Sequence, residues 1–198
     1  MEHTKTLAQA DAYRTFAICF YEPEAEWLAP ENLFSQLKHI LKMSLPPIVP
    51  NIEQLEQAFQ QYSIEELTVE YARLFVGPFK LEAPPYGSLY LETEGKVMGD
   101  TTMAVKNMYR QYGLEIAEDF KELPDHIAVE LEFMYYLGYQ ASVNGNRETY
   151  IQAQRTFLKQ YLAPFVFPFC EQIKTNTTNE FYRQLAETLS QFIRFQLS

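Results

Sequence analysis

Apolar residues recur at helical spacing along most of the chain, and this pattern limits the fold more than any other feature. Side chains three and four residues apart lie on one face of a helix. Such stripes, closed by proline, glycine or asparagine signals, occupy residues 5–21, 31–43, 51–59, 63–75, 100–113, 124–143, 147–163 and 179–196. We therefore predict an all-α fold, a compact bundle of roughly seven to nine helices.

A few short motifs mark the expected boundaries of these helices. "SIEE" at 63–66 fits a capping box, in which serine and glutamate satisfy each other's backbone N–H groups. Asp100 is expected to cap a helix that stops at Gly113. One stretch departs from the helical pattern: "SLYLETEGKVM" at 88–98 alternates in polarity, which predicts a small hairpin.

The composition is typical of one folded domain spanning residues 1–198, since 47% of the residues are hydrophobic and 21% charged. There are 26 acidic and 16 basic residues, which give a net charge of −10. This charge disfavours nucleic acid as a partner and speeds encounter with a basic peptide. No run approaches 18 apolar residues, so we expect neither a signal peptide nor a stable membrane insertion. The two cysteines, Cys19 and Cys170, fit a reducing cytoplasm.

Residues 114–123, "LEIAEDFKEL", are the expected internal boundary of this domain. The segment follows a helix stop and precedes Pro124, so it can act as a hinge between two lobes, 1–113 and 124–198.

Motifs for catalysis and cofactor binding are missing from the sequence. There is no phosphate-binding G-x-x-x-x-G-K-[ST] loop and no dinucleotide-binding G-x-G-x-x-G motif. The histidines, His3, His39 and His126, lie in separate segments and have no metal-ligand spacing with cysteine. We therefore expect no enzyme activity, no cofactor and no metal.

Two neighbouring features favour a binding function. The segment 73–91, "RLFVGPFKLEAPPYGSLYL", is far more apolar than a surface connection needs to be. Asp125 and His126 directly follow Pro124, where they either simply start a helix or supply polar groups to a ligand. An acid–base pair of the two is poor geometry, because adjacent residues on a helix do not face the same way.

The motifs in and around this segment resemble those of the TorD/DmsD family of redox enzyme maturation chaperones. The resemblance rests on "YARLFVGPFKLEAPPYGSLYL", "GDTTMAVKNMYRQYGL" and "PDH", in that order, and covers roughly residues 65–195. The patterns E-x-x-x-L-F-x-G-P and P-P-aromatic-G-S-x-[YW]-L look most like the DmsD branch, which serves dimethyl sulfoxide reductase. The "VELEFMYYL" that follows "PDH" is closer to TorD.

The resemblance implies a TorD-like, non-enzymatic cytoplasmic chaperone. Such proteins bind the twin-arginine signal peptide of a molybdopterin-dependent oxidoreductase and assist its maturation before export by the Tat translocase. Carried onto this chain, the peptide-binding residues are Tyr71, Leu74, Phe75, Phe79, Pro85, Tyr86, Asp125 and His126. Family members can exchange helical lobes, so a monomer and a domain-swapped dimer are both compatible with the sequence.

The chain departs from the family where tryptophan is common, since it has Tyr71, Phe79, Tyr86 and Phe165 there. An alternative reading is an assembly scaffold that binds the folded body of a nitrate reductase-like subunit rather than its leader. A hydrolase that uses His126 is a further alternative, for which the sequence offers no nucleophile motif.

Overall fold

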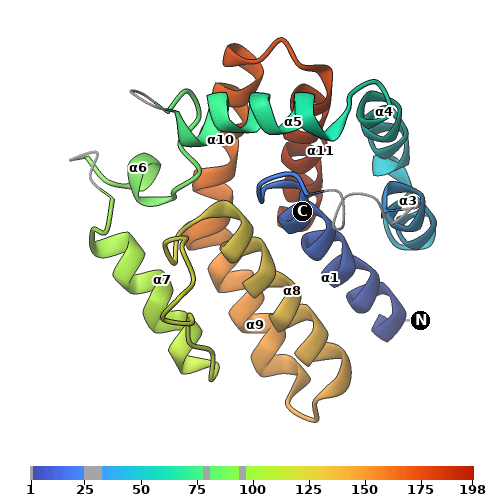
Figure 1. Ribbon diagram of the computed structural model, residues 1–198. Helices are drawn as coiled ribbons and strands as arrows, with labels where there is room; N and C mark the ends of the chain where they lie inside the picture. The colour runs from blue at the N-terminus through green and yellow to red at the C-terminus, as the bar shows by residue number, and fades with distance from the viewer. Residues whose placement is uncertain (1, 25–32, 78–80, 94–96) are drawn as a thin grey trace.

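A computed structural model describes residues 2–24, 33–77, 81–93 and 97–198. Figure 1 shows helices throughout, and in these ranges nine α-helices have eight or more residues and one has four. The predicted all-α class is therefore confirmed. The α-helices are α1 (Glu2–Cys19), α3 (Leu33–Ser44), α4 (Val49–Phe59), α5 (Ile64–Tyr71), α6 (Ser88–Leu91), α7 (Asp100–Gln111), α8 (Ile127–Val143), α9 (Arg147–Phe157), α10 (Ala163–Asn176) and α11 (Glu180–Leu197).

Local sequence signals account for several helix ends. The capping box of α5 is present: the Glu66 N–H donates to Ser63 Oγ at 3.2 Å, and the Ser63 N–H donates to Glu66 Oε2 at 2.8 Å. At α11, Asn179 Oδ1 accepts from the Tyr182 N–H at 3.3 Å. Gly113 follows α7 with φ of 77°, a left-handed conformation that glycine adopts without strain.

Two local predictions are wrong. The cap of α7 is Gly99, and Asp100 is its first helical residue, where a negative charge still suits the positive helix end. The expected hairpin at 88–98 is also wrong, because residues 88–91 form the helical turn α6. The N–H of Glu92 bonds the carbonyl of Ser88, so the backbone closes on itself instead of pairing with another strand.

Two widened π-helical turns continue α-helices without a break. The first, Ala72–Val76, extends α5, and the second, Leu158–Leu162, joins α9 to α10. A short 3₁₀ turn, Pro46–Ile48, leads into α4 in the same way. These turns keep the chain helical where proline or packing interrupts the regular α-helical hydrogen bonding.

The core is formed by helices from both ends of the chain. The N-terminal helix α1 packs along α8, α8 also packs on α9, and α11 packs on α4 and α10. Aromatic rings fill much of the interior, for example Phe20, Phe75 and Phe169. The described part of the chain contains no helix with the length and apolar character needed to cross a membrane. Cys19 and Cys170 are both free and buried.

Candidate functional site

The proline-rich segment is fixed to the start of α8 by a short antiparallel bridge between Tyr86 and His126. The Gly87 N–H donates to the Asp125 carbonyl at 2.8 Å, and the Ile127 N–H donates to the Pro85 carbonyl at 2.8 Å. These bonds bring together two regions that lie about forty residues apart in sequence and that we predicted to act together. The bridge therefore fixes the backbone of Asp125 and His126 relative to Tyr86.

Asp125 stabilises this bridge with its side chain. Its Oδ2 accepts a hydrogen bond from the Ser88 N–H at 2.8 Å, and the residue has 0% exposure. Its Oδ1 has no hydrogen-bond partner within the described residues. The carboxylate is thus oriented inward and holds the first turn of α6 in place.

His126 caps α8 and is neutral. Its Nδ1 accepts from the Ala128 N–H at 3.2 Å, which places the ring proton on Nε2. Nε2 lies 3.8 Å from Glu122 Oε2, beyond hydrogen-bonding distance. Burial lowers the pKa of His126 to about 3, because the charged ring would lose its hydration. Since Nδ1 binds the Ala128 N–H and Asp125 binds Ser88, the two side chains form no Asp–His relay.

The predicted binding residues occupy different depths. Tyr86 is half-buried, stands edge-on to His126 at 5.5 Å between ring centroids, and donates its hydroxyl to Glu122 Oε2 at 3.1 Å. Phe79 lies outside the described residues. The other predicted apolar residues, which all lie in the core, are Tyr71, Leu74, Phe75 and Pro85.

Sequence reasoning missed Glu130, one turn into α8. It has 0% exposure, and neither carboxyl oxygen has a hydrogen-bond partner within the described residues. A Cβ at Gly87 would come 3.2 Å from Glu130 Oε1, so the absence of a side chain at 87 makes room for this carboxyl. Burial, and to a smaller extent the charge of Asp125, raise the pKa of Glu130 well above its ordinary value. A glutamate inside the apolar run "IAVELEFM" was the available signal.

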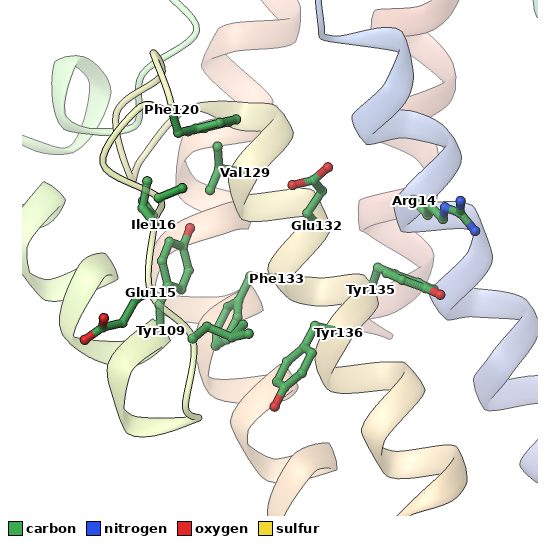
Figure 2. A pocket seen from close by; sticks show the side chains of 12 residues that line it. Arg14, Tyr109, Glu115, Ile116, Phe120, Val129, Glu132, Phe133, Tyr135 and Tyr136 are labelled. Atoms are coloured by element: carbon green, nitrogen blue, oxygen red, sulfur yellow. The ribbon is translucent and has the colours of Figure 1, made fainter. Parts of the chain in front are cut away.

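A cavity of about 430 Å³ lies beside this cluster, between α8 and the segment 114–120. We call it the 114–120 groove. Figure 2 shows Ile116 and Phe120 of the segment facing Val129 and Phe133 of α8. The lining residues are Arg14, Tyr109, Leu114, Glu115, Ile116, Ala117, Phe120, Val129, Glu132, Phe133, Tyr135 and Tyr136. The sequence did not indicate this groove, although we predicted from it that residues 114–123, which include the groove's outer wall, form a hinge.

The charged lining residues include Glu132 and Arg14, which reach the groove from α8 and α1. Burial of the carboxyl raises the pKa of Glu132 although the residue as a whole is exposed, and a hydrogen bond from Tyr21 and the charge of Arg14 oppose the rise. The Arg14 guanidinium lies 5.7 Å from the ring centroid of Tyr135, a cation–π distance. The groove thus has an apolar floor and an edge with charges of both signs.

Comparison with known proteins identifies the family. Residues 45–171, more than half of the chain, match the family model described as nitrate reductase delta subunit. The chain is 25% identical to "Probable Tat proofreading chaperone DmsD" of Haemophilus influenzae, over 91% of this chain and 86% of that protein. It is 27% identical to the Tat proofreading chaperone DmsD of Salmonella typhi, over 86% of this chain and 79% of that protein. The chain belongs to the TorD/DmsD family.

One further relative and one solved structure agree with the family and with the fold, respectively. The chaperone protein TorD of Photobacterium profundum is 31% identical over 64% of this chain and 60% of that protein. A crystal structure described as a redox enzyme maturation protein from Archaeoglobus fulgidus superimposes with a TM-score of 0.57 at 22% identity, over 93% of both chains, and supports the fold. As a TorD/DmsD protein, the chain is a non-catalytic redox enzyme maturation chaperone.

Proposed function

We propose that this chaperone binds the twin-arginine signal peptide of a molybdopterin-dependent oxidoreductase similar to dimethyl sulfoxide reductase. It would act in the cytoplasm, assist maturation of the precursor before Tat export, and contact components of the Tat translocase. The observation that carries the proposal is the similarity, along 86–91% of this chain, to relatives named Tat proofreading chaperones. The net charge of −10 agrees with a basic ligand.

Tyr86 and Glu122 are the proposed contact residues at the bridge. Tyr86 is half-buried, and the main-chain bonds on both sides of it hold it in place, so little conformational freedom is lost when a peptide binds. Glu122 is partly exposed and can accept a guanidinium in addition to the Tyr86 hydroxyl. Asp125 and His126 are buried, and we propose that they contribute by fixing this backbone.

The expected affinity is modest. A leader that buries four or five large apolar side chains gains about 1.5 to 3 kcal/mol for each. Association and ordering of the peptide cost about 4 to 15 kcal/mol. The difference corresponds to binding in the range of about 1 μM or somewhat tighter. An exposed arginine–carboxylate pair adds only about 0 to 1 kcal/mol, so charge sets register more than affinity.

Titration calorimetry with twin-arginine leaders encoded by the same genome tests the proposal. We expect at least one leader to bind. We expect Tyr86→Ala to weaken this binding, because the variant removes the fixed aromatic surface. Tyr139→Ala is the matched control, since Tyr139 is 41% exposed on α8 and does not line the groove. The proposed function is wrong if no leader binds. The proposed site at the bridge is wrong if a leader binds both variants equally.

One observation favours a second function. The matching family model is described as nitrate reductase delta subunit, which agrees with an assembly scaffold that binds the folded body of a nitrate reductase-like subunit. Pull-down of the client with and without its leader separates the two functions. Binding that persists without the leader favours the scaffold; binding that needs the leader favours signal peptide recognition.

A further inference from the structure

The 114–120 groove has the character of a binding surface. Nine of its twelve lining residues are aliphatic or aromatic, yet Phe120 is 40% exposed and Tyr135 and Tyr136 are only partly buried. A concave apolar surface that stays accessible to water is typical of a site that another molecule covers. We propose that the groove receives the apolar stretch of the leader, with a neighbouring arginine at Glu132. This inference rests on the proposed function.

The charges around the groove select a basic ligand. Glu115 and Glu132 line it, and the exposed Glu118 and Asp119 lie in the segment that covers it. Arg14 is the cation of the lining, so these five side chains sum to −3 when ionised. A carboxylate has capacity for several hydrogen bonds, and the one from Tyr21 leaves Glu132 able to accept a guanidinium. An apolar segment that carries a cation fits both properties of the groove.

A chain of side-chain contacts links the groove to Tyr86. The side chain of Tyr21 bonds Glu132 at the groove, and its ring stacks on His126 with 6.2 Å between centroids. The ring of Tyr86 stands edge-on to His126. Within this proposal, one peptide contacts Tyr86 with one part and the groove with another, since Tyr21 and His126 link the two places.

The outer wall of the groove is held in position at both ends. The Leu114 N–H donates to the Tyr109 carbonyl at 3.0 Å, where the wall begins. The Tyr109 hydroxyl donates to the Pro124 carbonyl at 2.8 Å, just beyond its other end. The Tyr136 hydroxyl, from α8, donates to the Tyr112 carbonyl at 2.9 Å. A wall fixed in this way loses little freedom on binding, which favours affinity.

Filling the groove tests the inference. Ala117→Trp places an indole in the cavity from an exposed position, so it disturbs no buried side chain. Its control is Val143→Trp, which puts the same ring at an exposed position at the end of α8. Glu132→Gln removes the carboxylate charge, and Glu53→Gln on the exposed face of α4 removes the same net charge elsewhere. The probe is the leader that binds in calorimetry.

We expect Ala117→Trp to weaken leader binding about tenfold or more. This is the effect expected when one apolar side chain of the leader is no longer buried. We expect Glu132→Gln to weaken leader binding by about threefold, in keeping with one partly exposed ion pair, and both controls to bind the leader nearly as tightly as the parent does. Equal affinity of Ala117→Trp and Val143→Trp overturns the inference while the proposed function stands. A change of oligomeric state in Ala117→Trp, seen by gel filtration without a change in leader affinity, assigns the groove to a second copy and also overturns it.

A small probe tests the groove independently of the proposed function. The dipeptide phenylalanyl-arginine amide carries one ring and cations, and its binding is read from backbone amide shifts in NMR spectra. Shifts at Ile116, Val129 and Phe133 that disappear in Ala117→Trp support the groove even if no leader binds. Dipeptide shifts that are absent or lie elsewhere count against the groove, even if a leader binds.

Discussion

His126 shows how one buried side chain can make stability depend on pH. Its pKa is about 3 in the folded protein and about 6.5 when unfolded, so the unfolded chain binds more protons between these values. Stability conferred by the neutral ring is therefore present above pH 6.5 and is lost as pH falls toward 3. Linkage gives a loss of about 2 kcal/mol between pH 7 and pH 5. The hydrogen bond from the Ala128 N–H is compatible only with the neutral ring, because a protonated Nδ1 cannot accept it.

We predict that His126→Asn has a shallower fall in the free energy of unfolding between pH 7 and pH 5 than the parent. Asparagine keeps the acceptor that caps α8 but does not titrate. Urea denaturation followed by circular dichroism measures the effect. The control is His39→Asn, at an exposed position on α3, which should keep the parent's profile. If the free energy of unfolding fell in parallel with pH for His126→Asn and the parent, the His126 ring would not be the source of the pH dependence.

Glu130 changes stability with pH in the opposite direction to His126. Its pKa is raised in the folded state, so stability is highest below the unfolded value of about 4.5 and is lost as pH rises toward the folded pKa. Within that window, the free energy of unfolding falls by about 1.4 kcal/mol for each pH unit, as long as the buried carboxyl stays protonated. Glu130→Gln should therefore be more stable than the parent at pH 8, with the gap narrowing toward pH 5. Glu53→Gln serves as an exposed control, and a gap that stays constant with pH would contradict this account.

The packing of α1 on α8 depends on a glycine. A Cβ at Gly138 would lie 2.8 Å from the Cβ of Ala10 and 2.9 Å from Gln154 Nε2, closer than atoms can approach. Ala10 is fully buried on α1, so its Cβ cannot rotate away. The two helices can approach this closely only because residue 138 has no side chain.

We predict that Gly138→Ala destabilises the protein by up to about 2 kcal/mol. Alanine gains about 1 kcal/mol of helix propensity, but the clash forces α1 and α8 apart at a cost of about 1–3 kcal/mol or more. Chemical denaturation measures the difference. Gly145→Ala is the matched control, because nothing lies within 4 Å of a Cβ there. A stability equal to or above that of the parent would mean that the helices shift without cost.

The elements were predictable where a local signal determines them. The capping box at Ser63 and the glycine after α7 each act within four residues, and the structure contains both. The hairpin expected at 88–98 failed because alternation in so short a stretch cannot outweigh the bonds that close α6. The all-α class therefore follows from helical periodicity. The wrong hairpin prediction lies in the segment that is hydrogen-bonded to the start of α8.

The site was less predictable, because burial depends on tertiary contacts. Motifs indicated Tyr86, Asp125 and His126, but only the bridge between residues 86 and 126 shows that the last two lie inside. The groove combines side chains from α1, α7, α8 and the segment 114–120, and no spacing within one segment predicts that arrangement. The hinge between 1–113 and 124–198 stays a prediction, and α1 and α8 pack together across it.

The charge of the whole molecule leads to a kinetic prediction for leader binding. With a net charge of −10 the protein attracts a basic leader over a distance set by the Debye length, about 30 Å at 0.01 M salt and about 3 Å at 1 M. The apolar contacts in the groove and at Tyr86 act only after docking, and salt screens them little. Raising the salt from 0.01 M to 1 M should therefore slow association about tenfold or more, while dissociation changes far less.

Stopped-flow mixing with a fluorescent leader measures both rates. A leader with its basic residues replaced by glutamine is the control, and its association should be slower at low salt and nearly independent of salt. Long-range attraction requires that the acceleration depend on the charges of both partners, so Glu132→Gln and Glu53→Gln should each reduce it slightly and by similar amounts. Steering and docking are then separable within one protein, since only Glu132→Gln should also speed dissociation. If salt acted mainly on dissociation, the carboxylates would be acting in the bound complex, and Glu122 and Glu132 would account for more of the affinity than the apolar groove.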